Sequence, residues 1–322
     1  MVRWGVAGPG AIAVGFADAM EQVEGGEIVA VASRSNERAN AFADRFGVRY
    51  RYGDYDDLAD APEVDVVYVA TPQSRHASDT LRMIEGGKHV LCEKPFALTA
   101  DQARDMAGAA RARGLFLMEA MWSRFLPAYQ VLTGAICEGT IGDPLLVEGD
   151  FGFRREIDPH DRLFRLELGG GGLLDLGIYP IQLCTLVLGS VEHVAAEGLI
   201  GTTGVDEQVA AVLRHRGGLG VVKAALRSSM TCSARIAGSD GVIGLPALMH
   251  CPTSITIASA AGIKEVDATF PGNGLQFEID EVHRCLATGT TESLVMSLEE
   301  TIAIAGVLDL IRAQIGLVFP DE

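Results

Sequence analysis

The chain has 322 residues, with 26 lysines and arginines against 43 aspartates and glutamates, so its formal net charge is −17. Such an acidic chain repels polyanions, which argues against nucleic acid or an anionic membrane surface as a partner. Its length is sufficient for two domains, each with a core of its own.

Nothing in the sequence is expected to direct or anchor the chain to a membrane. We find no apolar run that approaches the roughly 18 residues of a membrane span, and the first strand begins at about residue 3, which leaves no room for a signal peptide. The six cysteines are scattered without C-x-x-C spacing. We therefore expect a cytoplasmic protein with no disulfide framework and no metal site.

A glycine-rich turn follows the first apolar strand. Residues 3–7 are predicted to form a buried strand and residues 12–20 a helix, with Gly8, Gly10 and Ala13 at G-x-G-x-x-A spacing. In such a turn the first glycine bends the chain tightly, the second lets the backbone approach a phosphate, and the helix start faces the pyrophosphate. The turn predicts a dinucleotide site, and its cofactor-binding residues are expected to be Gly8, Gly10, Ala11 and Ile12.

The end of the second strand bears on which dinucleotide is bound. Residues 28–32 are predicted to form this strand, and an enzyme that uses NAD would place a carboxylate after it, to bind the ribose 2′-hydroxyl. Here the strand runs into Ser33, Arg34 and Ser35, and Arg38 follows. A hydroxyl and a guanidinium bind a 2′-phosphate, whereas a carboxylate would repel it. The sequence therefore predicts NADP, held by Ser33, Arg34 and Arg38.

Strands and helices alternate up to about residue 120, which indicates a parallel, doubly wound Rossmann sheet covered on both faces. Ligands of such sheets bind beyond the carboxyl ends of the strands. The residues that follow predicted strands at this edge are Thr71, Pro72, His76, Glu93 and Lys94. We expect them to contact the cofactor.

The second half of the chain has a different pattern of predicted strands and helices from the first. Predicted strands follow one another with few helices between them, which favours an open, largely antiparallel sheet. These strands span about residues 145–153, 207–214, 219–226 and 254–259. The class is thus α/β plus α+β, with an NADP-binding domain at 1–122 and a domain for substrate binding and oligomerisation at 123–322. Two closing helices, near 275–289 and 297–313, could pack back on the first domain.

Four consecutive glycines, 169–172, precede another informative stretch. They lack the Gly-Lys-Ser/Thr of a phosphate loop, so they are expected to permit a close backbone approach. If a helix begins near Leu173, Asp175 and Tyr179 lie four residues apart on one face, and Gln182 continues that face. A buried polar network at the helix start is the structural alternative to a catalytic role.

These motifs resemble the Gfo/Idh/MocA oxidoreductases over essentially the whole length. The resemblance rests on the Gly8 turn, Thr71-Pro72 with His76, Glu93-Lys94-Pro95, and Gly-Gly-Gly-x-Leu-x-Asp followed by Tyr179. Within the family, the strings at residues 114–125, 175–179 and 251–253 are similar to dimeric dihydrodiol dehydrogenases and NADP-dependent D-xylose dehydrogenases. The resemblance implies that Lys94 is catalytic and that the bond before Pro95 is cis. Many members carry histidine where Tyr179 stands, whereas this branch carries tyrosine.

The expected reaction transfers a hydride between NADP(H) and a CH–OH group, either C1 of an aldose or a trans-diol. This oxidation needs a base for the hydroxyl proton. An ordinary tyrosine pKa is near 10, and a neighbouring Lys94 ammonium together with the positive nicotinamide ring would lower the pKa of Tyr179. We expect Tyr179 to accept the proton while Lys94 polarises the substrate oxygen, although these roles could be exchanged. Asp175 would position Lys94 or a substrate hydroxyl.

The substrate walls are expected to be aromatic. The candidates are Trp122, Phe151 and Phe153, for which core packing is an equal alternative, and Arg162 is a candidate for cofactor or substrate contact. Two other functions stay open: an NADPH-dependent reductase of a keto- or anhydro-sugar, and an NADP-binding regulator without turnover. An exposed open sheet commonly forms a two-fold interface, so a homodimer is expected.

Overall fold

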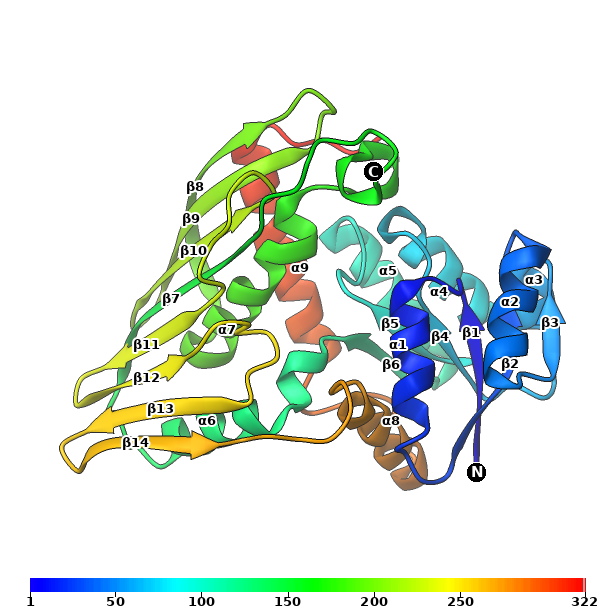
Figure 1. Cartoon of the computed structure of the whole chain (residues 1–322), viewed down its shortest axis with the longest axis horizontal. Helices are drawn as coiled ribbons and strands as arrows, with labels where there is room; N and C mark the ends of the chain where they lie inside the picture. The colour runs from blue at the N-terminus through cyan, green and yellow to red at the C-terminus, as the bar shows by residue number, and fades with distance from the viewer. Residues whose placement is uncertain (321) are drawn as a thin grey trace. The chain divides into compact units, whose positions relative to one another are not determined.

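The computed structural model describes residues 1–320 and 322. Its contacts divide the chain into two compact units (Figure 1). The first unit comprises Met1–Phe125 and Pro271–Ile302, and the second comprises Leu126–Phe270 and Ala303–Glu322. A segment close to the C-terminus therefore returns to the fold that the N-terminal residues begin.

The first unit contains a six-stranded parallel sheet in the order β3-β2-β1-β4-β5-β6. Chain order reverses between β1 and β4, which is the arrangement of a doubly wound Rossmann sheet. The predicted parallel sheet is confirmed, although β3 was not predicted. The strands are Val2–Ala7 (β1), Gly26–Ala32 (β2), Tyr50–Tyr52 (β3), Val66–Val69 (β4), His89–Glu93 (β5) and Leu117–Ala120 (β6).

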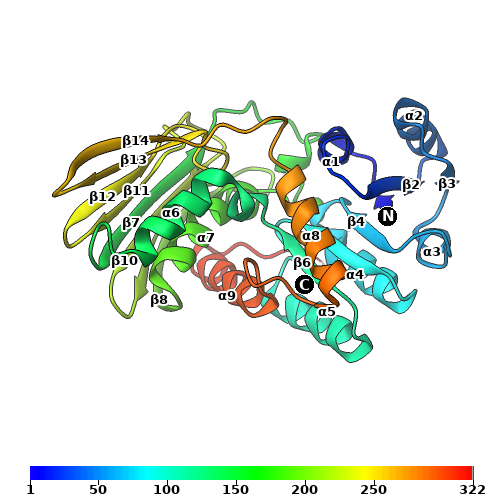
Figure 2. The ribbon, with the colours of Figure 1, turned by 90° about the horizontal axis from the view of Figure 1, so that it is seen from below.

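Helices cover both faces of this sheet. On one face, Phe16 of α1 stacks on Tyr68, with ring centroids 4.0 Å apart, and His283 of α8 accepts a hydrogen bond from the Trp4 indole at 3.0 Å. Figure 2 shows α1 and α8 beside the strands of this sheet. The helices of the unit are Ala11–Met20 (α1), Asn36–Phe46 (α2), Tyr55–Ala59 (α3), His76–Glu85 (α4), Ala100–Arg113 (α5) and Gln276–Thr288 (α8). The short 3₁₀-helices are Gln73–Arg75 and Trp122–Phe125.

The helix ends follow the local chemistry of the sequence. The Thr99 hydroxyl accepts a hydrogen bond from the backbone N–H of Gln102 at 3.2 Å, and the Ser297 hydroxyl accepts one from Glu300 at 3.3 Å. Both pairs have the three-residue spacing of a capping box, which is visible in the sequence. α8 ends at Gly289, whose φ of +68° is in the left-handed region that glycine adopts without strain.

The second unit contains an eight-stranded sheet in the order β14-β13-β12-β11-β7-β10-β9-β8. Neighbouring strands are antiparallel except β7 and β10, which pair in parallel. The prediction of an open, largely antiparallel sheet is confirmed. The strands are Pro144–Gly152 (β7), Val191–Ile200 (β8), Asp206–His215 (β9), Leu219–Ala225 (β10), Ala234–Gly238 (β11), Gly241–Leu245 (β12), Ser254–Ser259 (β13) and Gly262–Asp267 (β14).

Helices lie against one face of this sheet, and the other face is open. A Cβ atom added to Gly149 of β7 would lie 2.9 Å from Pro180, and one added to Gly220 of β10 would lie 2.7 Å from the Cys184 sulfur. The sheet and α7 therefore approach closely because these two strand positions carry no side chain. The remaining helices are Pro127–Cys137 (α6), Ile178–Leu188 (α7) and Leu298–Ile315 (α9), with 3₁₀-helices Arg162–Phe164 and Leu166–Leu168 and a π-helical turn at Leu173–Gly177.

One segment is more apolar than the sequence analysis recognised. By length and composition Leu166–Leu188 would suffice to cross a membrane. Most of it is buried inside the fold, as the core helix of a folded domain is. Its hydropathy is explained by the close packing of α7 against the sheet of the second unit.

Candidate functional site

The predicted glycine turn lies at the carboxyl end of β1. Gly8 has a φ of +90°, and a Cβ atom there would lie 2.9 Å from the carbonyl oxygen of Ala70. Gly10, by contrast, would have no atom within 4 Å of an added Cβ. The first glycine is thus required by the protein's own backbone, whereas the second faces open space.

The first turn of α1 begins at this open position. Gly10 is the N-cap residue and has no side chain to cap the helix, and Ile12 is 41% exposed although it is apolar. Uncapped N–H groups at a helix start attract anions. The predicted cofactor residues Gly8, Gly10, Ala11 and Ile12 therefore lie where a pyrophosphate would be bound.

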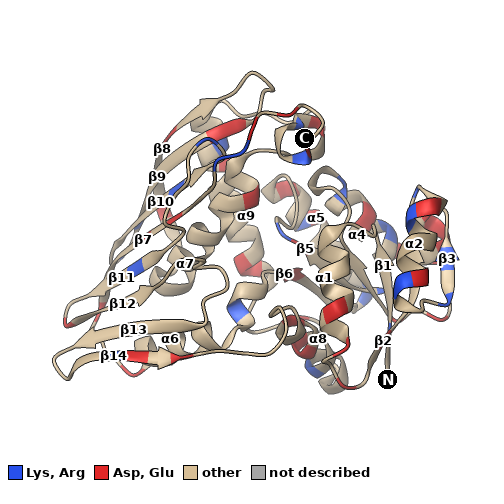
Figure 3. Cartoon of the chain, viewed as in Figure 1, with Lys and Arg blue, Asp and Glu red and all other residues tan. Residues whose placement is uncertain are grey.

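The end of β2 is basic, as predicted. Ser33 is buried, and its hydroxyl accepts a hydrogen bond from the N–H of Ser35 at 3.2 Å. Arg34 and Arg38 are exposed, and Figure 3 shows the basic positions along α2 that follow this strand. Both guanidinium groups are close enough to Tyr55 to lower the pKa of its phenol, which burial raises more strongly.

Sequence reasoning missed a third cation in this group, Arg75. It also lowers the pKa of Tyr55, and its guanidinium donates to the buried carboxylate of Asp79 at 2.9 Å. Arg75 was visible in the loop that follows β4, but nothing in the sequence showed that this loop and the end of β2 approach the same tyrosine. The tertiary structure assembles three arginines there.

His76 connects two loops at the carboxyl edge of the sheet. Its ring nitrogens lie 2.7 Å from the carbonyl oxygen of Pro95 and 2.9 Å from that of Thr71. Burial lowers the pKa of His76, while the hydrogen bonds to the two carbonyls act in the opposite direction. The histidine is 1% exposed, and it supports the loops that carry Thr71, Pro72 and Lys94 rather than facing a ligand itself.

The turn that carries Lys94 is held by glutamate side chains on both sides of Pro95. The Lys94–Pro95 peptide bond is cis, as the resemblance implied. The Lys94 N–H donates to Glu93 at 3.1 Å, and the Phe96 N–H donates to Glu119 at 3.1 Å. Burial raises the pKa of Glu119 to about 7. Glu119 was missed because it lies within an apolar strand, and only the register of β6 beside β5 places it under the turn.

In the second unit, the glycine run precedes the π-helical turn. The Ile178 N–H bonds to the carbonyl of Leu173, five residues back, so the helix predicted near Leu173 begins with a wider turn than an α-helix. Gly171 has a φ of +126°, and a Cβ atom there would collide with the side chain of Asp206. Such π-turns occur frequently at functional sites.

Asp175 lies within this π-turn and pairs with Arg162. Two guanidinium nitrogens of Arg162 lie 3.2 Å from the two carboxylate oxygens of Asp175. The Asp175 side chain is 8% exposed and that of Arg162 is 60% exposed. The pair therefore joins a buried anion to a guanidinium that remains accessible from solvent.

Tyr179 is part of a cluster of three rings. Its ring centroid lies 5.5 Å from Phe151 and 5.2 Å from His250, and Phe151 and His250 stack at 4.5 Å. Tyr179 and Phe151 are both buried. Phe153 is half-buried and is not one of these three rings. Trp122 is also half-buried, and it belongs to the first unit. His250 was missed as a partner of Tyr179.

Gln182, which was expected on the same helix face as Asp175 and Tyr179, belongs to a buried hydrogen-bond network. Its side-chain nitrogen donates to the Tyr129 hydroxyl at 3.2 Å, and that hydroxyl donates to the backbone carbonyl of Met249 at 3.1 Å. Gln182 is fully buried. It therefore links α7 to α6 and to the residue that precedes His250.

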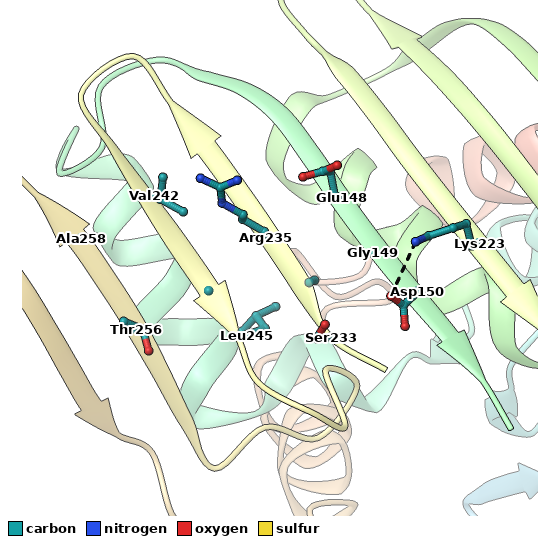
Figure 4. A pocket seen from close by; sticks show the side chains of 12 residues that line it. Glu148, Gly149, Asp150, Lys223, Ser233, Arg235, Val242, Leu245, Thr256 and Ala258 are labelled. Carbon is teal, nitrogen blue, oxygen red and sulfur yellow. Dashed lines mark ion pairs between the residues drawn. The ribbon is translucent and has the colours of Figure 1, made fainter. Parts of the chain in front are cut away.

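A hollow of about 460 Å³ lies elsewhere, on the open face of the second unit's sheet (Figure 4). Its lining includes Glu148, Asp150, Lys223 and Arg235, and the Lys223 amine lies 3.8 Å from Asp150. None of the predicted catalytic or cofactor residues lines it. Among residues 1–320 and 322, no group of His, Cys, Asp and Glu side chains is arranged to hold a metal ion.

A unit with a parallel Rossmann sheet and an open glycine turn, followed by a unit whose mixed sheet packs against a helix with a buried tyrosine, defines a dinucleotide-dependent oxidoreductase. Residues 2–121 match the family model described as an oxidoreductase family with an NAD-binding Rossmann fold, and residues 129–244 match the GFO/IDH/MocA C-terminal domain. The chain belongs to the GFO/IDH/MocA oxidoreductases.

Individual relatives agree with this membership. A trans-1,2-dihydrobenzene-1,2-diol dehydrogenase from Mus musculus is 36% identical over 332 residues, covering 100% of this chain and 99% of that protein. A 3-ketoreductase from Actinomadura kijaniata, crystallised with NADP and TDP-benzene, is 27% identical with a TM-score of 0.88 over 98% of each chain. A levoglucosan dehydrogenase in complex with NADH and levoglucosan shares the fold, with a TM-score of 0.88 at 23% identity, covering 98% of this chain and 97% of that one. The cofactor of this chain is a nicotinamide dinucleotide.

Proposed function

We propose that the protein is an NADP-dependent dehydrogenase that oxidises a CH–OH group of a sugar or diol, at C1 of an aldose or in a trans-diol. The observation that carries this proposal is the Glu93-Lys94-Pro95 turn. It lies at the carboxyl end of β5, the edge of a Rossmann sheet at which ligands bind, and glutamate side chains hold its backbone at Lys94 and at Phe96. A lysine placed there serves proton chemistry beside a nicotinamide ring.

The bound dinucleotide supplies the hydride acceptor. The protein's own residues then have to remove one proton and orient the hydroxyl. Lys94, as an ammonium, donates a hydrogen bond to the substrate oxygen, and the Tyr179 hydroxyl oxygen accepts the proton once that positive charge favours the phenolate. The exchange of these two roles stays open. Asp175, held by Arg162, orients a neighbouring substrate hydroxyl.

The preference for NADP over NAD is supported by charge. Arg34, Arg38 and Arg75 all act on the phenol of Tyr55, and the strand before them ends in Ser33 rather than in an acid. Three guanidinium groups favour a dianionic 2′-phosphate, which they bind through charge-assisted hydrogen bonds. We infer that this cluster binds the adenosine end of NADP.

The substrate class is supported by the mixture of aromatic and polar groups near Tyr179. Phe151 and His250 give a ring surface on which a sugar or a diol can stack, and the Asp175–Arg162 pair provides acceptors and donors for hydroxyls. The relatives bear the names of a diol dehydrogenase, a ketoreductase and a sugar dehydrogenase. The ketoreductase favours the second candidate, an NADPH-dependent reduction of a keto- or anhydro-sugar.

Steady-state kinetics tests the proposal. We expect NADPH to form with one or more members of a panel of D-xylose, D-glucose, other aldoses and trans-diols. Tyr179→Phe and Lys94→Ala should each lower kcat by several orders of magnitude while the Kd for NADP stays within about threefold. Loss of less than tenfold in the Tyr179→Phe variant would remove that tyrosine from the mechanism. If no member of the panel gave NADPH, and no keto- or anhydro-sugar oxidised NADPH, the results would favour the alternative of an NADP-binding regulator without turnover.

We further propose a homodimer formed through the open face of the second unit's sheet. Glu148 and Asp150 share this face with Lys223 and Arg235 (Figure 4), so acidic and basic groups can pair across a two-fold axis. Val212 and Leu219, 41% and 44% exposed, lie on neighbouring strands of the same sheet. Light scattering should report a dimer for the wild type and for Leu294→Asp, which changes an exposed loop residue of the first unit, but a monomer for Val212→Asp. A monomeric wild type would contradict this proposal.

A further inference from the structure

Two residues of the second unit have a backbone conformation that side chains normally avoid. Cys232 has a φ of +53° and Leu248 a φ of +64°, and no other non-glycine residue among 1–320 and 322 has a positive φ. A left-handed conformation brings Cβ close to the following carbonyl oxygen, so it is unfavourable for a residue as large as leucine. Such strain persists only where the surrounding structure imposes it, and it is concentrated at functional sites.

Both strained residues hold the segment that carries His250. The Cys232 carbonyl oxygen accepts a hydrogen bond of 2.8 Å from the Met249 N–H, and the Leu248 carbonyl oxygen accepts one of 2.8 Å from the Cys251 N–H. The residues on either side of His250 are therefore each bonded to a strained residue. The strain in the two segments thus coincides with the placement of this histidine.

Met249 fixes the same segment from inside the second unit. Its side chain is buried, and its carbonyl oxygen accepts a hydrogen bond of 3.1 Å from the Tyr129 hydroxyl. Both backbone polar groups of the residue before His250 are thus bonded within the protein. The imidazole Nε2 of His250 lies 3.5 Å from the sulfur of the following residue, Cys251. The ring is therefore held at a defined place.

His250 is the accessible member of the three rings around Tyr179. Tyr179 and Phe151 are 5% and 8% exposed, whereas His250 is half-buried. Its imidazole stacks on Phe151 with the ring planes 22° apart, and its ring centroid lies 5.2 Å from that of Tyr179. A ligand that comes from solvent to this cluster therefore meets the imidazole.

The edge of an imidazole carries groups that a hydrocarbon ring lacks. Its nitrogens donate or accept hydrogen bonds, whereas the neighbouring Phe151 ring does neither. When a ligand covers the imidazole of His250, water is removed from these nitrogens, and the loss is compensated only if the ligand brings hydroxyls. A sugar carries hydroxyls beside the carbon that reacts and beyond it. A trans-diol on a hydrocarbon ring carries only the two hydroxyls of the diol itself.

We propose that His250 is a specificity-determining residue, which binds a substrate hydroxyl other than the one that is oxidised and so selects an aldose over a trans-diol of a hydrocarbon ring. This inference rests on the proposed function, in which the substrate reacts beside Tyr179. A site that hydrogen-bonds a substrate hydroxyl strongly rejects an analogue without it. The strained backbone at Cys232 and Leu248 is the cost of keeping the imidazole beside that tyrosine.

Kinetics with two classes of substrate tests the role of His250. His250→Phe keeps a flat ring to stack on Phe151 and removes both nitrogens. We expect kcat/KM for the aldose that the wild type oxidises best to fall at least tenfold, chiefly through KM. For trans-cyclohexanediol, kcat/KM should stay the same or rise. His250→Gln, which keeps a hydrogen-bonding group, should recover part of the aldose activity. His193→Phe, the same change at an exposed position on β8, should leave both substrates unaffected.

Binding without turnover separates recognition from chemistry. NADPH has no place for a hydride, so an aldose binds to the enzyme–NADPH complex without being oxidised. We expect the Kd of the aldose in this complex to rise about tenfold in His250→Phe. Among aldoses that each lack one hydroxyl, one should bind the wild type at least tenfold more weakly than the parent sugar. In His250→Phe this deoxy-aldose and its parent should bind equally.

Three results would overturn the inference: a wild type that oxidises and binds only the trans-diol, equal losses for aldose and diol in His250→Phe, or discrimination against the deoxy-aldose that persists in this variant. None of them would affect the assignment of the enzyme to CH–OH oxidation. If Tyr179→Phe kept full kcat, the proposed mechanism would fail, while the Kd of the aldose in the NADPH complex would still report the role of His250. The two failures are therefore distinguishable.

Discussion

Asp206 accepts a hydrogen bond of 2.6 Å from the backbone N–H of Leu173, which ties β9 to the first residue of the π-turn. Asp206 is fully buried, and the glycine at position 171 makes room for it. The segment that carries Asp175 and Tyr179 is thus held at its first residue by a hydrogen bond to a buried carboxyl. The stability of the site therefore depends on the protonation of this carboxyl, and hence on pH.

The first prediction concerns pH. Burial raises the pKa of Asp206 to about 7 from an ordinary value of 3.8. Between these values the folded state holds a proton that the unfolded state has lost, so stability falls as pH rises through this range. Asp206→Asn cannot ionise and its amide oxygen still accepts from Leu173. Its melting temperature should exceed that of the wild type increasingly from about pH 5 to pH 8, by a free energy of at most about 4 kcal/mol.

Thermal unfolding of both proteins across this range checks the sign. A constant difference between Asp206→Asn and the wild type would show that Asp206 has the same protonation state at all these values. A difference that grows toward acid would mean that the folded state favours the ionised form.

The second prediction separates the two glycines of the turn after β1. Gly8→Ala places a side chain at a φ of +90° and against the Ala70 carbonyl, which costs about 1–2 kcal/mol from the backbone alone and should lower the melting temperature by several degrees. Gly10→Ala meets no protein atom, so its melting temperature should stay unchanged. Instead, the Kd for NADP should rise about tenfold or more, because the added methyl group occupies the place of a phosphate.

Calorimetry and titration of cofactor fluorescence measure the two quantities, and each variant serves as the control for the other. Unchanged NADP affinity in Gly10→Ala would contradict the placement of the pyrophosphate at the start of α1.

The third prediction concerns cofactor choice. Arg34→Asp should raise the Kd for NADP by about 10- to 100-fold, which corresponds to the loss of one or two charge-assisted hydrogen bonds. The Kd for NAD should stay the same or fall. Arg45→Asp is the matched control, because it makes the same charge change in the last turn of α2, where Arg45 pairs with Asp18 at 3.4 Å. Equal loss in both variants would mean that only the overall field of the protein was altered.

The fourth prediction concerns the Arg162–Asp175 pair. Arg162→Ala should lower kcat/KM for the sugar or diol about tenfold, because the buried Asp175 carboxylate loses its bidentate partner. Stability should change by less than about 1 kcal/mol, since the arginine is largely exposed. Arg165→Ala, which breaks a local pair with Glu167, is the control. If Arg162→Ala changed the Kd for NADP alone, the arginine would contact the cofactor instead.

The sequence predicted those elements whose pattern is local. The strand at β1, the glycine turn and the capping residues Thr99 and Ser297 are specified by neighbours within a few positions, and the structure confirms them. Strands β8, β11, β12 and β14 of the second sheet were missed. The interior strands β11 and β12 have only five residues each and contain glycine, whereas β8 and β14 are the edges of the sheet. Their side chains are mostly exposed, so they lack the apolar alternation that reveals a half-buried strand.

Residues that matter through distant contacts could not be found in this way. Arg75 lies in a polar loop and Glu119 in an apolar strand, and neither carries a motif. Glu119 gains its chemistry from burial beneath the Lys94 turn, and Arg75 gains its own from the approach of its loop to Tyr55. A single sequence contains no signal for such proximity.

The sequence by itself determined the class of the fold and the dinucleotide turn, because backbone freedom at Gly8, hydrophobic period and helix capping act over a few residues. Only the tertiary structure decided which ionisable groups share one environment: Arg75 with Arg34 around Tyr55, and Tyr68 with Glu93. Burial and charge act through space, and their effect on a proton depends on neighbours that chain folding brings together from segments as distant as the ends of β2 and β4.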